Sequence, residues 1–264
     1  MQPILSARHV TKSFAAGRGT AVMAVQNLSL DVAEGELVCL LGASGCGKST
    51  ILNMFAGFVP PDRGELRLRG EPIHGIEPRC GVVFQSYALF PWKTVRGNVE
   101  FGLRMRRMPR QQRRRRADLF IDLVKLTGFE DHYPAELSGG MQQRVTLARI
   151  LAADPEVLLM DEPFAALDAM TRQVMQEELL RIHAQSGKTI VFITHSIDEA
   201  LILADRIIVL SARPGRVKAV LPNHLPTPRT VAVQLSPAYA TLKAAVWAEV
   251  EAEVRRHVET DRGF

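Results

Sequence analysis

Short apolar runs alternate with helical patterns along most of this 264-residue chain. Apolar runs at 37–41 and 157–160, and the β-branched run at 189–194, predict buried strands, because a strand covered on both faces is apolar at nearly every position. Helical patterns at 48–55 and 170–185 follow two of these runs. Repeated strand–helix units of this kind favour a mainly parallel sheet with helices on its faces.

Both the N-terminal part and the middle of the chain depart from this alternation. Near the N-terminus, 4–10 and 22–32 show the alternating or β-branched pattern of strands, separated by a turn at Gly17 and Gly19. Between about residues 86 and 153 strand patterns are absent and helical periodicity prevails, which predicts an inserted helical lobe. Shorter strands are expected at 65–69, 81–84 and 207–210, and a helix is expected from Ser196.

The tail after about Arg213 has a pattern of its own. Three prolines, Pro222, Pro226 and Pro228, predict an extended connection. Ser236-Pro237 then predicts a helix start, with serine as the cap and proline in the first turn. Apolar residues recur three or four positions apart in this helix, at Tyr239, Leu242, Val246, Val250 and Val254. We expect this stripe to pack on the main domain or on a partner.

Composition narrows the class of protein. No apolar run approaches the roughly 18 residues that a membrane-spanning helix needs. The first residues lack the basic start and apolar core of a secretory signal, so we expect a soluble, cytoplasmic protein. The three cysteines, Cys39, Cys46 and Cys80, form no Cys-x-x-Cys pair, which argues against a disulfide framework and a structural zinc site.

The net charge of +5 comes from one stretch of the chain. Residues 104–116 hold eight arginines and no acid, which leaves 25 basic against 28 acidic residues elsewhere. A nucleic-acid-binding protein shows a broader basic face, so we do not expect nucleic acid as a partner. The stretch fits a solvated helix face, or a contact with acidic lipid headgroups or an acidic partner loop.

The strongest candidate for chemistry lies between a predicted strand and a predicted helix. Its residues, Gly42-Ala43-Ser44-Gly45-Cys46-Gly47-Lys48-Ser49, fit the pattern G-x-x-x-x-G-K-[ST]. Glycines let backbone N–H groups surround phosphate oxygens, and the helix N-terminus favours their negative charge. Lys48 can reach the β- and γ-phosphates, and the Ser49 hydroxyl can ligate Mg²⁺. A plain glycine turn would explain the glycines but not this combination.

Two acids end the apolar run at 157–160. Asp161 suits indirect ligation of Mg²⁺. Glu162, one residue further on, can polarise an attacking water. Alone, the two residues would be an ordinary acid pair at a strand end, but together with the phosphate loop they indicate nucleotide hydrolysis.

A second anion site is predicted at residues 137–144, which read LSGGMQQR. Ser138 is predicted to cap a helix that runs through about Ala152, and Gly139 and Gly140 leave the amides at its N-terminus open. The two anion sites could face one phosphate cluster within a chain, or each could serve a different copy of the molecule.

These motifs, together with Gln85, Ala166-Leu167-Asp168 and His195, resemble in order and separation those of the ATP-binding cassette family of ATPases, over about residues 4–220. The resemblance implies an α/β P-loop NTPase with a mainly parallel sheet, an N-terminal antiparallel β subdomain and an inserted α-helical subdomain. The cassette domain would comprise residues 1–220, with the helical subdomain at about 86–153, and residues 221–264 would form a C-terminal extension with one helix. It also implies a head-to-tail homodimer, with ATP between the phosphate loop of one copy and residues 138–140 of the other.

The resemblance further implies a role for each matching residue. ATP would be bound by Phe14, which would stack on adenine, and by the loop residues Gly42, Ala43, Ser44, Gly45, Cys46, Gly47, Lys48, Ser49 and Thr50. The opposite copy would contribute Ser138, Gly139, Gly140 and Gln142, and Asp168 would pair across the dimer. Catalysis would depend on Glu162, His195 and Gln85, and Mg²⁺ would be held by Ser49, Gln85 and Asp161. The sequence departs from many relatives at Met141, where they carry glutamine, and at Phe14, where tyrosine is common.

Three longer stretches, at 84–95, 164–172 and 211–217, resemble the ATPases of bacterial nitrate, aliphatic sulfonate and taurine importers, with the taurine type nearest. This implies uptake of a small anionic or zwitterionic solute through a separate integral membrane permease, with a periplasmic or other extracytoplasmic solute-binding protein acting indirectly. The subunit would be peripheral, at the cytoplasmic face of the inner membrane. A permease helix would enter a groove beside Gln85 lined by Phe90, Pro91 and Trp92, although Phe90 and Trp92 also fit local core packing.

Two alternatives stay open at this point. One is a soluble cassette ATPase that acts on nucleic acid or protein complexes, and the other is the ATPase of an exporter. Repair and chromosome ATPases of the first kind interrupt the cassette with long coiled coils, and translation-factor relatives carry two cassettes. The sequence shows neither feature.

Overall fold

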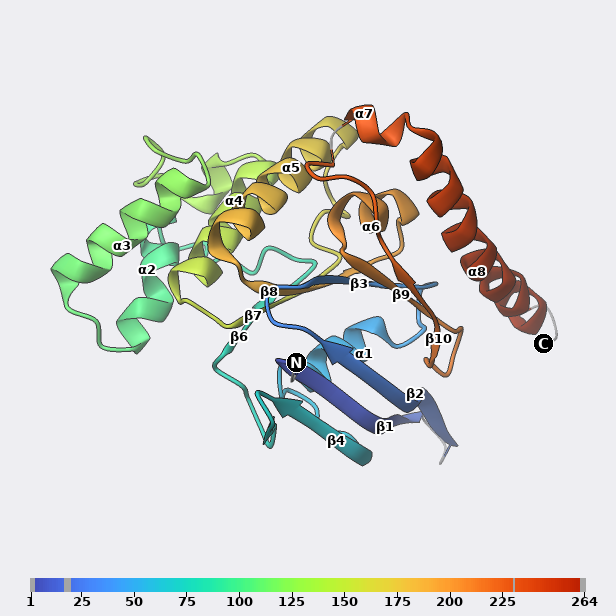
Figure 1. Cartoon of the computed structure of the whole chain (residues 1–264). Helices are drawn as coiled ribbons and strands as arrows, with labels where there is room; N and C mark the ends of the chain where they lie inside the picture. The colour runs from blue at the N-terminus through green and yellow to red at the C-terminus, as the bar shows by residue number, and fades with distance from the viewer. Residues whose placement is uncertain (1–2, 17–19, 230, 262–264) are drawn as a thin grey trace. The chain divides into compact units, whose positions relative to one another are not determined.

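The computed structural model describes residues 3–16, 20–229 and 231–261, and Figure 1 traces its helices and strands. The chain forms two compact units. The first comprises residues 1–77 and 188–264, and the second comprises residues 78–187. No helix in the described ranges has the length and apolar character needed to cross a bilayer.

The first unit is built on two sheets. Its strands are β1 (Leu5–Ala16), β2 (Thr20–Val32), β3 (Leu37–Leu41), β4 (Arg63–Leu68), β5 (Glu71–Pro72), β8 (Thr189–Thr194), β9 (Arg206–Leu210) and β10 (Val217–Pro222). The strands β2, β1, β4 and β5 form an antiparallel sheet in that order. In the other sheet, β3 pairs in parallel with both β8 and β9, and β10 lies antiparallel to β9 at the edge.

Helices cover the parallel sheet of the first unit. They are α1 (Lys48–Phe55), α6 (Ile197–Leu203) and α8 (Pro237–Asp261), and the short helix α7 (Val231–Gln234) packs against α8. Every residue of β3 and β8 is buried, because α1 contacts β8 while α6 contacts both strands, on the opposite side of the strands in Figure 1. The continuous apolar runs in the sequence follow from this two-sided burial.

The second unit contains β6 (Cys80–Val83), α2 (Val95–Met105), α3 (Arg110–Leu123), a 3₁₀ turn at Pro134–Glu136, α4 (Gly139–Ala152), β7 (Val157–Asp161) and α5 (Ala169–Ser186). β6 and β7 pair in parallel. The helices α2, α3 and α4 pack against one another, and they bury Val99, Leu103, Ile121 and Val145 almost completely. The helical lobe predicted from the sequence therefore has a core of its own.

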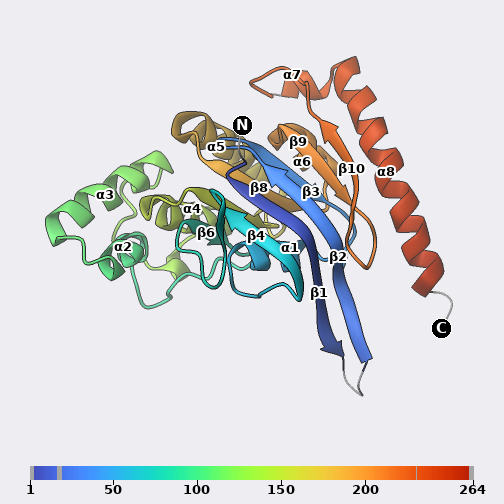
Figure 2. The same ribbon diagram turned by 60° about the horizontal axis from the view of Figure 1, so that its bottom comes forward.

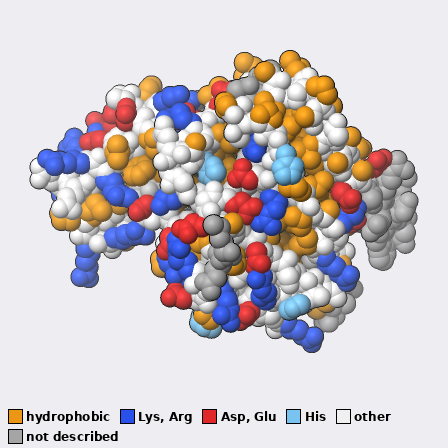
Figure 3. All heavy atoms as spheres, viewed as in Figure 1, with side chains coloured by type: hydrophobic (Ala, Val, Ile, Leu, Met, Phe, Trp, Pro, Cys, Tyr) orange, Lys and Arg blue, Asp and Glu red, His pale blue; other side chains and the backbone are white. Residues whose placement is uncertain are grey.

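The arginine-rich stretch divides into two groups in this unit. Arg113 pairs with Glu100 at 2.8 Å, and Arg116 donates a hydrogen bond to the carbonyl oxygen of Ala152. These two arginines tie α3 to α2 and α4. The others, Arg104, Arg106, Arg107, Arg110, Arg114 and Arg115, are exposed, and basic side chains are frequent over α2 and α3 in Figure 3. The stretch is thus partly structural and partly a solvated face.

The predicted elements agree closely with the structure where the pattern was strong. The bounds of β3, α1 and β8 are those predicted, and α4 begins after Ser138 as expected. The predicted turn at Gly17 and Gly19 lies outside the described residues.

Three features differ from the sequence-based expectation. Phe14 lies inside β1, which extends to Ala16, rather than after the first strand. The short strands β5 and β10 lie at sheet edges and were not predicted, because β5 is exposed and β10 is at most half-buried, so neither has the clear buried face that predicts a strand. The tail between Pro222 and Ser236 contains the short helix α7 as well as extended chain.

The predicted apolar stripe of α8 packs on the first unit. Tyr239 and Val246 are buried, and α8 contacts α6, β9 and β10. Figures 1 and 2 both show this helix running alongside β10. The side chain of Val254 lies outside the described residues.

Candidate functional site

The phosphate loop connects β3 to α1 in the first unit. Gly45 and Gly47 have φ of 77° and 95°, in the left-handed region that favours glycine. A Cβ on Gly47 would lie 2.6 Å from the carbonyl oxygen of Ala24, so the neighbouring strand also requires glycine there. No side chain caps α1, and the N–H groups of its first turn are therefore suited to an anion.

Lys48 is buried within its own loop. Its side chain is only 5% exposed, and its Nζ donates hydrogen bonds to the carbonyl oxygens of Gly42 and Ala43, at 2.8 and 2.9 Å. Carbonyl partners of this kind can be exchanged for phosphate oxygens, which are stronger acceptors because they are charged. The ammonium group is therefore already held at the loop that would surround the phosphates.

His195 follows directly after β8, next to the phosphate loop. The parallel register pairs Leu41 with Thr194, so Gly42 and His195 continue from neighbouring strand ends. Thr194 donates a hydrogen bond to Glu199 and accepts one from the N–H of Ser196, at 2.5 and 2.9 Å. His195 is exposed between these two fixed residues, which suits a side chain that contacts a ligand.

A parallel strand pair in the second unit likewise determines where Gln85, Asp161 and Glu162 lie. Val83 pairs with Met160 in the parallel register of β6 and β7, so the segments that carry these three residues leave the sheet at the same edge. Glu162 has a φ of 45°, a conformation that is strained for a residue with a side chain. Such strain is often found at functional sites, where the surrounding structure maintains it.

The motif at residues 137–144 forms the start of α4. Ser138 is the N-cap and accepts a hydrogen bond from the N–H of Met141 at 3.3 Å. A Cβ on Gly140 would lie 2.6 Å from the Thr171 side chain of α5, so a larger residue would push these two helix starts apart. Gln142 instead donates to the carbonyl oxygens of Pro134 and Leu137, which places its side chain against the preceding loop rather than at the helix start.

Asp168 caps α5, close to this motif. Its carboxylate accepts a hydrogen bond from the N–H of Thr171 at 3.0 Å, and hydrogen bonds from Thr171 hold the pKa of Asp168 below its usual range. The side chain is exposed. Asp168 therefore stays ionised at neutral pH and is accessible to a partner.

An apolar groove lies beside the segment that follows Gln85. It encloses about 390 Å³ and is lined by Phe84, Phe90, Phe101 and Ile150 among others, with Arg106 and Arg149 at its sides. Asn98 fixes one wall, because its side chain exchanges hydrogen bonds with the backbone of Phe90. Trp92 is 71% exposed next to Phe90, with ring centroids 5.7 Å apart.

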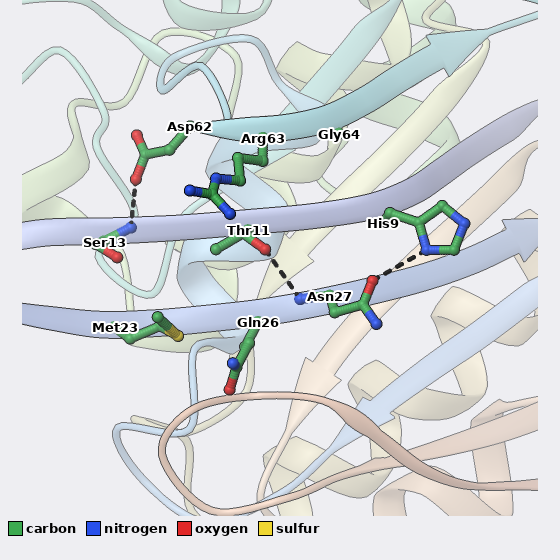
Figure 4. Close-up of a pocket in the computed structure, with 9 residues that line it drawn as sticks. All are labelled: His9, Thr11, Ser13, Met23, Gln26, Asn27, Asp62, Arg63 and Gly64. Carbon is green, nitrogen blue, oxygen red and sulfur yellow. Dashed lines mark hydrogen bonds between the residues drawn. The ribbon is translucent and has the colours of Figure 1, made fainter.

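A larger cavity lies elsewhere, and none of the predicted ATP-binding residues lines it. It measures about 660 Å³ and is formed by β1, β2 and the start of β4 (Figure 4). Its lining includes His9, Thr11 and Ser13, whereas Phe14 is not part of it. Phe14 is 42% exposed, and Lys12 Nζ lies 5.7 Å from its ring centroid. Its exposed ring is therefore available for stacking.

Two residues beside the phosphate loop were not predicted from the sequence. Arg213 Nε donates a hydrogen bond to the carbonyl oxygen of Gly45 at 3.3 Å. A Cβ on Gly215 would collide with the carbonyl oxygen of Cys46. The Arg-Pro-Gly sequence at 213–215 indicates a turn. The local sequence pattern could not show that this turn contacts the phosphate loop, which lies nearly 170 residues earlier in the chain.

Divalent magnesium prefers oxygen ligands, and the candidate residues supply them. Ser49 presents an exposed hydroxyl at the first turn of α1. Gln85 and Asp161 offer amide and carboxylate oxygens at one edge of the second unit. Each of these groups is of a donor type that suits Mg²⁺. No cluster of three or more His, Cys, Asp or Glu side chains that could hold a metal by itself occurs among the described residues.

These features define a P-loop ATPase. A glycine-rich loop leads from a buried parallel strand into an uncapped helix, and two acids stand at the end of another strand. The chain belongs to the ABC transporter family, whose family model matches residues 25–165. It is 50% identical over 213 residues to the taurine import ATP-binding protein TauB of Roseobacter denitrificans, covering 81% of this chain and 80% of that protein.

Solved structures support the same assignment. The ATP-binding cassette MJ0796, in a dimeric post-hydrolysis state bound to ADP and Pi, superimposes with a TM-score of 0.73 at 34% identity, over 83% of this chain and 98% of that one. The protein cbiO1 from Clostridium perfringens, part of the ABC transporter complex cbiONQ, gives a TM-score of 0.74 at 28% identity, over 83% and 88%. The P-loop fold and the ATPase activity expected from the sequence are thus confirmed.

Proposed function

We propose that this ATPase powers a bacterial importer, driving uptake of a small anionic or zwitterionic solute of the taurine, alkanesulfonate and nitrate class. The observation that carries the proposal is the apolar groove beside the Gln85 segment, because an ATPase that drives transport needs a surface for its membrane partner. The importing direction and the solute class rest on the similarity to a taurine import ATP-binding protein.

The groove would receive a helix of a separate permease. Its aromatic walls suit the apolar face of a helix. The exposed ring of Trp92 lies beside Phe90, although neither Trp92 nor Pro91 lines the groove itself, contrary to the expectation from the sequence. Arg106 and Arg149 could pair with acidic side chains of that helix.

A solute-binding protein on the outer side of the membrane would select the solute, and the ATPase would lie at the cytoplasmic face of the inner membrane. Within the chain, residues 1–220 would form the cassette, with its helical subdomain at about 86–153 and an extension at 221–264.

ATP would be bound by the phosphate loop, with Lys48 on the β- and γ-phosphates and Phe14 against the adenine. Glu162 would polarise the attacking water, and His195 would contact the γ-phosphate and hold that water. Gln85 would sense the nucleotide and pass its state to the permease. Mg²⁺, held by Ser49, Gln85 and Asp161, would neutralise charge on the phosphates. Donors arranged around a γ-phosphate stabilise the charge that develops during hydrolysis.

The active unit would be a head-to-tail homodimer. The open helix N-terminus at Ser138 and Gly139 would approach the γ-phosphate bound by the other copy, and the exposed, ionised Asp168 would pair across the dimer. The dimeric state of the related cassette MJ0796 supports this arrangement. ATP binding would close the dimer and switch the permease, and hydrolysis would reopen it.

Uptake by the complete transporter tests the proposal. The chain would be produced with the permease and solute-binding protein encoded beside its gene, and placed in vesicles loaded with ATP. We expect ATP-dependent accumulation of taurine, an alkanesulfonate or nitrate, and its loss in a transporter with Glu162→Gln. Transport of such a solute in the outward direction, or none of the three solutes transported by an assembled complex with ATPase activity, would refute the assignment.

A further inference from the structure

The loop at residues 211–216, which connects β9 to β10, lies against the phosphate loop. Gly215 exchanges backbone hydrogen bonds with β2, since its N–H donates to Ala24 and its carbonyl oxygen accepts from Gln26. A side chain at this glycine would strike the carbonyl oxygen of Cys46. These contacts place the neighbouring Arg213 over Gly45, at the apex of the phosphate loop.

The hydrogen bond from Arg213 fixes one peptide unit of the phosphate loop. Its Nε donates to the carbonyl oxygen of Gly45, and its Nη2 lies 3.1 Å from the position a Cβ on Gly45 would take. In a trans peptide the carbonyl and the next N–H point in opposite directions. Holding the Gly45 carbonyl toward Arg213 therefore fixes the direction of the Cys46 N–H, which donates a hydrogen bond to the carbonyl oxygen of Ala43 with an N···O distance of 3.3 Å.

The position of Arg213 depends in turn on the C-terminal helix α8. Glu253 of this helix is 3% exposed and accepts a hydrogen bond from the N–H of Ala212, at 2.8 Å. Lys218 of β10 pairs with the same carboxylate at 3.2 Å and donates to the carbonyl oxygen of Glu249 at 2.6 Å. A buried carboxylate from the end of the chain thus holds the backbone immediately before Arg213.

The other half of α8 is attached behind His195. The Tyr239 hydroxyl donates to Asp198 of α6 at 2.6 Å, and Lys243 pairs with the same carboxylate at 2.6 Å. α6 begins two residues after His195. Figures 1 and 2 show α8 extending along this side of the unit. One helix therefore connects the α6 segment with the loop that touches the phosphate loop.

We propose that Arg213 is a positioning residue of the phosphate loop and that α8, through Glu253, holds Arg213 in place. The C-terminal helix thereby sets the nucleotide affinity of this ATPase. This inference rests on the proposed binding of phosphates by residues 42–50. It gives the extension after residue 220 a role in the ATPase cycle, because anything that displaces α8 would weaken nucleotide binding.

Substitution of Arg213 in the full-length chain tests whether Arg213 positions the phosphate loop. Arg213→Ala is expected to weaken ADP binding about fivefold, the effect of losing one hydrogen bond, and to raise KM for ATP by a similar factor with a smaller change in kcat. Arg213→Lys keeps the charge and one donor and should restore part of the affinity. Arg216→Ala is the matched control, since Arg216 lies in the same loop but donates to Gln26 instead. Wild-type ADP affinity in Arg213→Ala, measured by calorimetry, would overturn the proposal.

A double-mutant cycle tests whether Glu253 of α8 acts on nucleotide binding through Arg213. Glu253→Ala should weaken ADP binding like Arg213→Ala, and the double variant should be little weaker than either, because both changes release the same peptide. Glu253→Gln, which keeps an acceptor for the Ala212 N–H, should bind more tightly than Glu253→Ala and guards against loss of folding. Ala248→Ser, at an exposed position of α8, serves as the control. The proposed coupling between Glu253 and Arg213 would be contradicted if the two losses of ADP affinity were fully additive in the double variant. Wild-type ADP affinity in Glu253→Ala would contradict it as well.

The same measurement separates this inference from the function on which it rests. Lys48→Ala should lose most ADP affinity if residues 42–50 bind phosphate. Loss in Lys48→Ala with normal affinity in Arg213→Ala would leave the phosphate loop assigned and refute only the role of Arg213. Unchanged affinity in Lys48→Ala would refute the phosphate loop itself.

Discussion

Single residues in this protein are held by short, local contacts that leave their functional groups accessible. His195 is exposed between Thr194 and Ser196, both of which are fixed by hydrogen bonds. Glu162 keeps a left-handed backbone conformation that would relax in an isolated peptide. The His195 side chain is thus exposed between two hydrogen-bonded residues, whereas Glu162 is half-buried at a backbone position that the surrounding structure maintains.

Glu162 provides the prediction at this scale. Glu162→Gln removes the negative charge proposed to polarise water but keeps the shape of the side chain. We expect turnover to fall by about 100-fold or more while ATP still binds, and the ATP-bound protein to elute as a dimer in gel filtration. Glu177→Gln, an exposed change on α5, should behave as the wild type. Normal turnover in Glu162→Gln would remove Glu162 from the proposed role.

Helices and strands act in this structure mainly by bringing distant segments to the same place. The register of β3 and β8 continues into the phosphate loop on one strand and His195 on the other. α8 attaches to α6 through Tyr239 and Lys243, which share the carboxylate of Asp198. The attachment is ionic at Asp198, so it must depend on pH.

The pH dependence of this attachment has a definite sign. Burial alone would raise the pKa of Asp198, but hydrogen bonds from Lys243 and Tyr239 outweigh it and lower the pKa. A carboxyl group whose pKa is lower in the folded than in the unfolded chain stabilises the fold fully above its unfolded pKa, about 4, and loses that effect as pH falls through the folded value.

We therefore expect Asp198→Asn to lower the melting temperature by a constant amount between about pH 5 and pH 8. The difference from the wild type should shrink as the pH falls below about 4, where the wild-type carboxylate takes up a proton. The melting temperatures of the wild type and the variant are measured at each pH by thermal unfolding followed by circular dichroism. Asp131→Asn, at an exposed acid of the second unit, controls for a general effect of charge. A difference that grows with acidity would show that Asp198 is not held as described.

At the scale of the whole molecule, the proposed homodimer determines how the two anion sites are used. The phosphate loop and the helix start at Ser138 both offer open amides, and each would complete the site of the other copy. A variant defective in one site can then be rescued by a variant defective in the other. No arrangement that uses both sites within one chain allows such rescue.

Mixed dimers test this arrangement. Lys48→Ala and Ser138→Phe should each lose ATPase activity as pure proteins. An equal mixture should recover about a quarter of the wild-type rate, because half of the dimers are mixed and each mixed dimer contains one intact site of two. ATPase rates before and after mixing, at protein concentrations that favour dimers, give the result. Two inactive proteins that stay inactive when mixed would argue for sites that are complete within one chain.

The sequence by itself determined the elements with a strong local signal. The phosphate loop, the strand before it and the cap at Ser138 could all be predicted, because glycine spacing, uninterrupted burial and N-capping act over a few residues. The edge strand β10 and the helix α7 were not predicted, because β10 is at most half-buried and α7 is only four residues long, so neither carries a clear hydrophobic pattern. Only the tertiary structure decided that Arg213 touches Gly45 and that Glu253 holds the backbone beside it. These contacts join positions far apart in sequence, and such proximity follows from how the sheet and helices pack, which no local pattern encodes.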